Sequence, residues 1–182
     1  MVSVLLKRKS PVRLETSSDR GFTLIELLIV VAIIGIIAAI AVPGLLRARM
    51  AGNEASALAS LRAVSSAQQA YASKCLGFAP DLPELLNAGN FLSPDLAWGV
   101  TINKSGYTFT MAAGLGNVPL GAPPAGCTNT GSAYYASAIP LSPGTSGIRG
   151  FATDEPGTIW QDTSGLAPAQ PFAIAGTINV IQ

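Results

Sequence analysis

Histidine is absent from this chain of 182 residues, and cysteine occurs only twice. The first absence removes the side chain that serves most often as a general base and as a metal ligand. Because Cys75 and Cys127 lie far apart, a cysteine-only zinc site is also excluded. The sequence contains no phosphate-binding glycine loop and no nucleophile elbow. We therefore predict no catalytic residue, no metal, no cofactor and no enzymatic activity.

Charge is scarce as well. Charged residues make up 12% of the chain, about half of the roughly 25% that is usual in globular proteins. The formal net charge is only +1, so there is no bulk electrostatic attraction to nucleic acid and none is predicted as a partner. Hydrophobic residues, in contrast, make up 49% of the chain. This balance indicates that part of the protein meets an apolar environment.

The apolar residues are concentrated near the N-terminus. No charged residue occurs from Leu27 to Leu46, where nearly every side chain is Leu, Ile, Val or Ala. A helix of this length rises about 30 Å, the thickness of a bilayer core. A buried core helix would normally carry a polar face, so we predict a membrane-spanning helix over residues 22–46. An ordinary secretory signal, cleaved near the small residues 39–41, is an alternative.

The charges that flank this apolar run predict its orientation. Five basic and two acidic residues lie within residues 1–21, whereas Arg47 and Arg49 follow the run. Basic flanks remain in the cytoplasm. We therefore expect the N-terminus to be cytoplasmic and the rest of the chain to be exported.

Glu26 lies directly before the apolar run. A carboxylate near hydrocarbon is costly, by about 2.5 to 3.5 kcal/mol at the centre of a helix and by less near its end. Such a group is usually paired and functional. Arg20 is one candidate partner. A new α-amino group is another, if the chain were cut just before Phe22.

The segment 20–38 reads RGFTLIELLIVVAIIGIIA, and Pro43 and Gly44 follow within the same predicted helix. This segment resembles the N-terminal signature of type IV pilins and pseudopilins, in which a Gly precedes a Phe, a Glu follows four residues later, and a proline interrupts the helix. The resemblance implies that a prepilin peptidase cleaves between Gly21 and Phe22 and that Phe22 is N-methylated. It also implies that Glu26 pairs with the Phe22 amine of a neighbouring subunit during assembly.

The resemblance further implies what the protein does and where it lies. The expected protein is a structural subunit held in the inner membrane, then assembled by a membrane platform into a homopolymeric extracellular pilus for adhesion, motility or a related role. A minor pilin or a type II secretion pseudopilin is the alternative within the family. A membrane-tethered binding domain with an uncleaved anchor is the alternative outside it.

Helical periodicity continues beyond Pro43 and Gly44, where we expect the helix to bend or locally melt. The predicted apolar stripe has a gap at Gln68, and the polar positions between its members include Glu54. The stripe comprises Ala51, Ala55, Leu58, Leu61, Val64, Tyr71 and Cys75. An amphipathic helix of this kind packs on a sheet.

After Cys75 the sequence turns to short helical and β signals. A helical turn is expected over 81–87, and a hairpin turn over 103–106. Candidate strands, rich in β-branched and aromatic residues, are 98–103, 107–112, 132–139, 148–153, 158–161 and 172–181. The segment 147–160 (GIRGFATDEPGTIW) resembles the hairpin of the pilin head domain. Its Asp154 and Glu155 are explained by turn chemistry, although calcium binding there stays open.

The predicted fold is therefore α+β: a long N-terminal helix, half hydrophobic and half amphipathic, packed on an antiparallel sheet of about four strands, as in type IV pilins. The predicted organisation is a leader over 1–21, a membrane and filament-core helix over 22–46, an amphipathic helix over 47–76, and a β-sheet head domain over 77–182. Outside the cytoplasm, Cys75 and Cys127 suit a disulfide, although pairing between subunits stays open.

Overall fold

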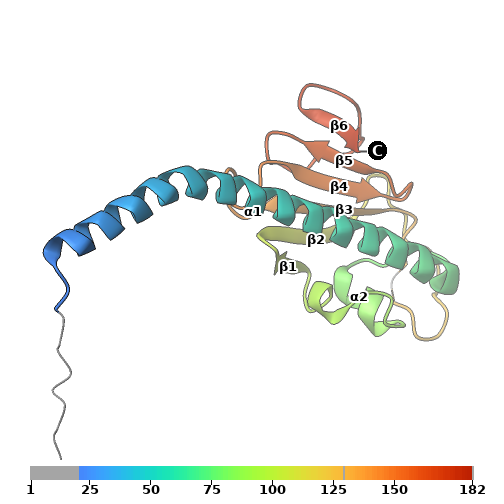
Figure 1. Cartoon of the computed structure of the whole chain (residues 1–182). Helices are drawn as coiled ribbons and strands as arrows, with labels where there is room; N and C mark the ends of the chain where they lie inside the picture. Colours follow the sequence, from blue (N-terminus) through green and yellow to red (C-terminus); the bar gives the residue numbers. More distant parts are fainter. Residues whose placement is uncertain (1–20, 129, 182) are drawn as a thin grey trace, which may run out of the picture. The chain divides into compact units, whose positions relative to one another are not determined.

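The computed structural model describes residues 21–128 and 130–181 (Figure 1). Apart from Gly21, the predicted leader lies outside the described residues. Backbone contacts divide the chain between Ala41 and Val42 into two compact units, and each is described by itself below. The second unit contains the predicted head domain.

Helix α1 runs from Leu24 to Cys75 and includes Pro43. The predicted melting at Pro43 and Gly44 is therefore absent: both residues are helical. A proline inside a helix lacks the N–H that would bond to the carbonyl four residues earlier, here that of Ala39. Strong helix formers on both sides, chiefly Ala and Leu, sustain the remaining backbone bonds. The helix ends where Leu76 adopts a left-handed conformation, with φ of 60°.

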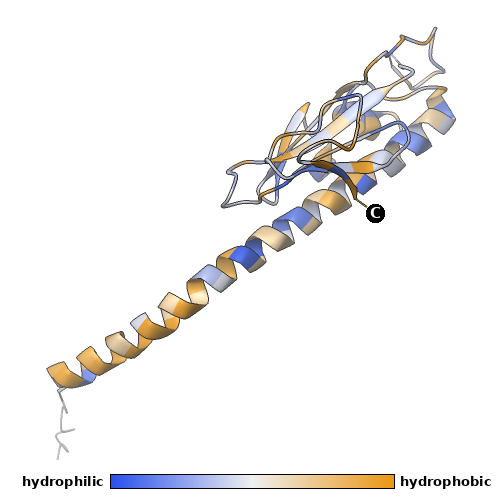
Figure 2. Cartoon of the chain, turned by 90° about the horizontal axis from the view of Figure 1, so that it is seen from above, coloured by the Kyte–Doolittle hydropathy of each residue, from blue (hydrophilic) through white to orange (hydrophobic). Residues whose placement is uncertain are grey.

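The second half of α1 packs on the sheet with a stripe that differs from the predicted one. Ala51 and Ala55 are exposed, whereas Glu54 and Gln68 are buried. In Figure 2 the first part of the helix is mostly hydrophobic, with a hydrophilic patch near its start, and the second part alternates. The buried positions are Glu54, Ala57, Ser60, Leu61, Val64, Ala67, Gln68, Tyr71 and Cys75. The stripe is therefore partly polar, and the apolar pattern alone misplaced its start.

A single antiparallel sheet faces this half of the helix, with its strands in the sequential order β1-β2-β3-β4-β5-β6 (Figure 1). The strands are β1 Thr101–Lys104, β2 Tyr107–Ala113, β3 Tyr134–Pro140, β4 Gly150–Asp154, β5 Ile159–Asp162 and β6 Ile178–Ile181. The helix-on-sheet fold is confirmed, with six strands in place of about four. All six candidate segments contribute a strand, and the edge strands β1 and β6 are each four residues long, shorter than the predicted segments 98–103 and 172–181.

Every strand except β2 begins later than predicted, and the shift is largest for β1 and β6. Trp98 is 82% exposed and precedes β1, since residues 94–96 form a 3-10 helix and 98–100 remain irregular. Phe172 also lies outside a strand, because its ring stacks on that of Trp160 while only Ile178–Ile181 pair with β5. Between β1 and β2, Ser105 and Gly106 both have positive φ, as a two-residue hairpin turn requires.

Aromatic and aliphatic side chains from the helix and the sheet form one core. Tyr71, Tyr107, Tyr134, Phe109 and Phe151 are its largest fully buried members. The short helix α2, Leu82–Asn87, covers one side of the core with Leu82 and Leu85. Asp81 caps α2 by accepting a hydrogen bond from the Glu84 amide at 3.0 Å.

Candidate assembly site

The start of α1 is held by a reciprocal pair of hydrogen bonds between Thr23 and Glu26. The Thr23 amide and hydroxyl donate to Glu26 Oε2, at 2.9 and 2.6 Å. The Glu26 amide in turn donates to Thr23 Oγ1 at 3.3 Å. This is a capping box, the pattern in which a Thr and a Glu three residues later satisfy each other's backbone donors. It explains why the helix begins at Leu24 and not at Phe22.

The residues before this cap are therefore outside the helix. Gly21 and Phe22 are non-helical and exposed, and Phe22 is 80% exposed. The peptide bond between them is accessible, without helical hydrogen bonds that would have to be broken. Glu26 is exposed as well, and hydrogen bonds to its carboxylate engage Oε2 alone among the described residues. Its Oε1 can therefore accept a further donor.

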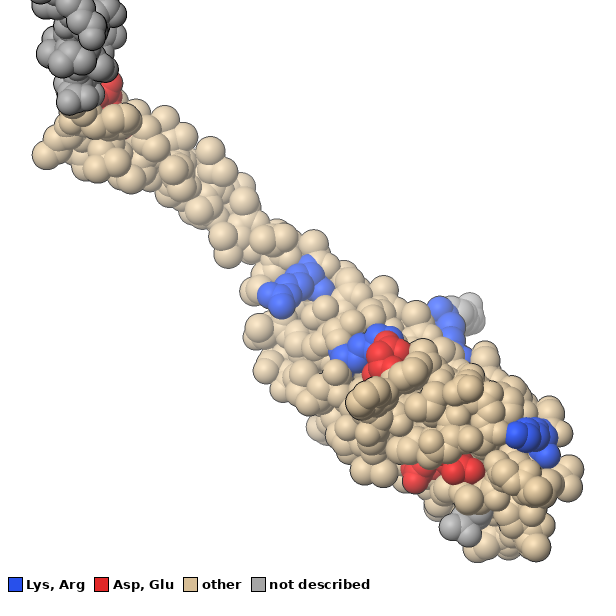
Figure 3. All heavy atoms as spheres, turned by 90° about the horizontal axis from the view of Figure 1, so that it is seen from below, with Lys and Arg blue, Asp and Glu red and all other residues tan. Residues whose placement is uncertain are grey.

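The helix surface that follows is apolar on all sides. Every residue from 21 to 49 is exposed, including the large side chains Ile25, Ile33 and Ile40. One helix in the described chain, α1, is long and apolar enough to cross a membrane. Figure 3 shows charged side chains near the start of this helix and over the head domain, with none between. Water is a poor solvent for such a surface, so it requires lipid or other apolar helices around it.

The two cysteines lie at the far end of α1. Cys75 and Cys127 form a disulfide, with their Cα atoms 5.7 Å apart and a sequence separation of 52. The bond joins the last residue of α1 to the Gly- and Pro-rich segment between β2 and β3. Beside it, Tyr71 donates a hydrogen bond to the Thr128 carbonyl at 3.1 Å, and Glu84 accepts one from the Thr128 amide at 2.9 Å.

Glu54 holds the opposite end of the head domain, and sequence reasoning missed it. Its Oε2 accepts from Arg149 Nε and Nη2 at 2.9 and 2.7 Å, and its Oε1 accepts from the amides of Ile148 and Arg149 at 2.9 and 3.2 Å. The Arg149 guanidinium also donates to Gln161 and lies over the Phe151 ring. The carboxylate thus ties α1 to the segment before β4. An isolated acid at helical spacing from Leu61 was the only sequence signal.

Removing this carboxylate should destabilise the head domain. We expect Glu54→Ala to lower the free energy of unfolding by about 3 kcal/mol. Removing one partner of a buried ion pair leaves the other charge uncompensated, and the partial exposure of Arg149 keeps this cost at the lower end of the usual range. Urea unfolding of the detergent-solubilised chain, followed by tryptophan fluorescence, measures the loss. Gln161→Ala is the matched control, with an expected loss of about 1 kcal/mol. Equal losses in both variants would contradict this role for Glu54.

The same contact gives a pH dependence of defined sign. Burial raises the pKa of Glu54, but hydrogen bonds from Ile148 and Arg149 outweigh it, so the net pKa lies below its ordinary value of 4.5. The carboxylate therefore contributes stability above pH 4.5, and this contribution is lost as the pH falls through the lowered pKa. The stability difference between the unaltered chain and Glu54→Ala should shrink over that acidic range.

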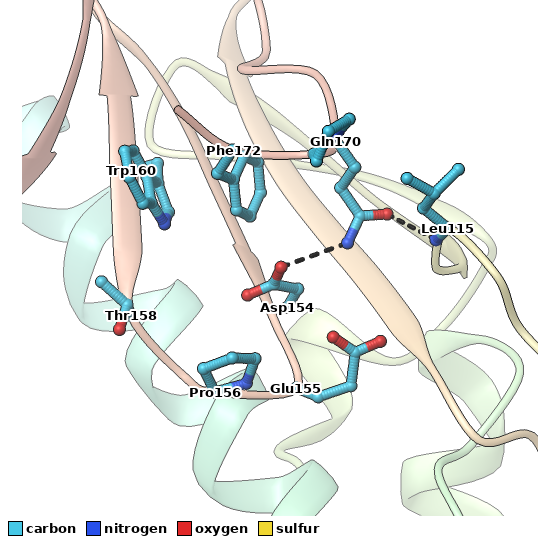
Figure 4. Close-up of a pocket in the computed structure, with 9 residues that line it drawn as sticks. Leu115, Asp154, Glu155, Pro156, Thr158, Trp160, Gln170 and Phe172 are labelled. Carbon is cyan, nitrogen blue, oxygen red and sulfur yellow. Dashed lines mark hydrogen bonds between the residues drawn. The ribbon is translucent and has the colours of Figure 1, made fainter. Parts of the chain in front are cut away.

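Some residues singled out in the sequence come together and others do not. Gly21, Phe22 and Glu26 lie within one short segment at the start of α1. Asp154 and Glu155 lie at the turn between β4 and β5, where they border a pocket (Figure 4). The described residues contain no group of three or more His, Cys, Asp or Glu side chains placed to hold a metal ion.

Comparison with known proteins places these features in a family. Residues 16–42 match the family described as the prokaryotic N-terminal methylation motif. The chain is 43% identical over 72 residues to the type IV major pilin protein of Myxococcus xanthus, a match that covers 35% of this chain and only 33% of that protein. No solved structure matches significantly.

Two proteins of Thermus thermophilus match over most of their length. The chain is 35% identical over 95 residues to the major component of the type IV wide pilus, covering 52% of this chain and 72% of that protein. It is 36% identical over 102 residues to the major component of the type IV narrow pilus, covering 52% of this chain and 88% of that protein. On this similarity, and on its methylation motif and helix-on-sheet fold, the chain belongs to the type IV pilin family.

Proposed function

We propose that this chain is made as a prepilin, cut between Gly21 and Phe22, N-methylated on Phe22, and polymerised with copies of itself into a type IV pilus. As a type IV pilin it is a structural subunit of the pilus and not an enzyme acting on a substrate. Its partners in this scheme are a prepilin peptidase, an assembly platform in the inner membrane, membrane lipid before assembly, and other copies of the chain.

The capping box at the start of α1 is the observation that carries this proposal. It starts the helix at Leu24 and leaves the bond between Gly21 and Phe22 outside the helix and exposed, which favours access by a peptidase. Cleavage there creates an ammonium group four residues from Glu26. The free Oε1 of Glu26 supports pairing with that ammonium on a neighbouring copy, since a charge near hydrocarbon needs an opposite one.

The exposed apolar part of α1 supports both states of the protein. Before assembly its side chains match the hydrocarbon of a bilayer, with the predicted N-terminus in the cytoplasm and the head domain exported. In the fibre the same side chains pack against those of other copies. Contacts between different surfaces of identical subunits need not close into a ring, and they then generate a helical filament.

The relatives support a place in the body of the fibre. All three are named as major pilins or major pilus components. We therefore propose that this chain is a major subunit and not a minor pilin or a secretion pseudopilin. It should be the most abundant polypeptide in filaments sheared from the cell surface and purified.

The processing of the N-terminus tests the proposal directly. We expect mass spectrometry of the chain from purified filaments to find an N-terminal peptide that begins at Phe22 and carries one additional methyl group. Chain from cells that lack the prepilin peptidase is the control and should retain the leader. A filament or surface protein that still carries residues 7–9 would contradict the proposal and support an uncleaved anchor.

A further inference from the structure

The head domain has a pocket beside the β4–β5 hairpin. It has a volume of about 370 Å³ and lies at the turn between β4 and β5, bordered by the loop before β6 (Figure 4). Its wall includes Asp154, Glu155, Thr158, Trp160, Gln170 and Phe172. These residues come from the β4–β5 hairpin and the loop before β6, and Leu115 from the segment after β2 completes the lining.

One wall of the pocket is aromatic. The rings of Trp160 and Phe172 stack with centroids 5.4 Å apart and planes at 25°. In Figure 4 the two rings stand side by side above the turn that carries Pro156. The face of an aromatic ring, and of an indole above all, attracts a cation such as a guanidinium.

The other wall is acidic and lacks a cation. Asp154 accepts a hydrogen bond from Gln170 Nε2 at 3.2 Å, and Gln170 is itself fixed because its Oε1 accepts from the Leu115 amide at 2.7 Å. The salt bridges within the described residues are Lys104–Asp95 and Arg149–Glu54, so neither pocket carboxylate has a cationic partner there. Burial raises the pKa of Asp154, as expected for a carboxylate without a cation beside it.

The cations that match this pocket are on the helix of the same chain. Arg47, Arg49 and Arg62 are exposed on α1, and none forms a salt bridge within the described residues. Arg62 points away from the sheet, since its neighbours Leu61 and Val64 define the buried face. These arginines and the pocket therefore occupy different surfaces of one subunit.

We propose that, in the fibre, this pocket binds the guanidinium of an α1 arginine from a second copy of the chain. This inference rests on the proposed function, and it names one contact between subunits. A guanidinium between two carboxylates and an indole combines charge-assisted hydrogen bonds with aromatic stacking. Because pocket and arginine lie on different surfaces, the contact is heterologous and repeats from subunit to subunit.

Reversal of the charge in the pocket tests the contact. We expect Glu155→Lys to reduce sheared surface filaments at least tenfold in cells that assemble the fibre, with unchanged amounts of processed chain in the membrane. Glu155→Gln should give a smaller loss, because it removes attraction without adding repulsion. Asn179→Lys, at an exposed position on β6, is the matched control and should leave filaments unchanged. Normal filaments from Glu155→Lys, or an equal loss from Asn179→Lys, would overturn the inference.

Reversing the charge of each candidate arginine identifies the partner residue. Arg47→Glu, Arg49→Glu and Arg62→Glu are each made alone and together with Glu155→Lys. Restoration of filaments by one double variant, to within about threefold of the unaltered chain, supports the contact and names the partner. Failure of all three pairs overturns it. Processing at Phe22 is followed in the same cells: absent processing of the unaltered chain contradicts the proposed function, whereas normal processing without rescue contradicts only this contact.

Discussion

Replacing Glu26 by leucine is expected to abolish filaments while leaving membrane insertion intact. Leucine lengthens the apolar run, so insertion of α1 becomes more favourable. The ammonium of a neighbouring Phe22, however, would then enter the fibre core without an opposite charge. Breaking a buried ion pair by removing one partner costs about 3 to 5 kcal/mol. A loss of about 3 kcal/mol at each contact weakens subunit addition by roughly two orders of magnitude.

The capping box makes a second variant necessary, because leucine also removes the hydrogen bonds to Thr23. Glu26→Gln keeps an oxygen that can accept from the Thr23 amide, yet it carries no charge. If pairing with the Phe22 ammonium drives assembly, Gln should fail as Leu does. If the carboxylate only starts the helix, Gln should assemble normally. Thr23→Ala weakens the cap while it keeps the Glu26 charge, so it should retain filaments.

Quantification of sheared filaments beside membrane-bound chain measures these effects. Each variant must first be found in the membrane fraction at the level of the unaltered chain. Filaments at normal abundance from both Glu26→Leu and Glu26→Gln would remove the assembly role proposed for this residue. Normal filaments from Glu26→Gln, together with a loss from Glu26→Leu, would show that Glu26 acts in helix capping and not in pairing.

The N-terminal part of the molecule could be predicted because its signal is local. A charge-free apolar run, an acid at its edge and a Gly-Phe pair before it are read directly from neighbouring residues. The capping box was equally local, since Thr23 and Glu26 have the required spacing, but Glu26 was weighed only as a charge in an apolar setting. That residue therefore has a structural role beside the proposed functional one.

The face of α1 that meets the sheet was harder to predict because three polar residues, Glu54, Ser60 and Gln68, belong to it. Gln68 is fully buried, since its side-chain amide donates to the Ala79 carbonyl at 3.1 Å and accepts from the Ala79 amide at 2.9 Å. Glu54 is buried through contacts with Arg149, 95 residues away in sequence. A periodicity argument counts such residues as solvent-facing, because their partners are distant and invisible to local patterns.

The pocket depends on the same kind of distant contact. Trp160 and Phe172 read as separate strand residues in the sequence, and only their stacking in the structure brings the loop before β6 against β5. Asp154 and Glu155 were correctly assigned to a turn. Their position beside an aromatic wall could not follow from turn chemistry, which describes four consecutive residues and not the loop that faces them.

Removing the disulfide is the second change with a large expected effect. Replacing Cys75 and Cys127 together by serine should lower the free energy of unfolding by about 4 kcal/mol, the chain-entropy value for a loop of this length. The folded loop has further anchors: Tyr71 and Glu84 both bond to the backbone of Thr128. Burial and the charge of Glu84 raise the pKa of Tyr71 to about 12, so its hydroxyl remains a donor at neutral pH. The loop should therefore stay in place without the bond, and the loss should come mainly from a freer unfolded chain.

Urea unfolding of the full chain in detergent separates these contributions. The double serine variant should have a lower unfolding midpoint than the unaltered chain, and the unaltered chain treated with a thiol reductant should match it. Tyr71→Phe, which keeps the ring but not the hydroxyl, should lose about 1 kcal/mol when made alone. In the double serine background, Tyr71→Phe should lower the free energy of unfolding by more than it does alone, because the loop then depends on its remaining hydrogen bonds. Additive losses would show that the disulfide and the Thr128 contacts hold the loop independently, and an unchanged midpoint without the disulfide would show that the bond contributes nothing.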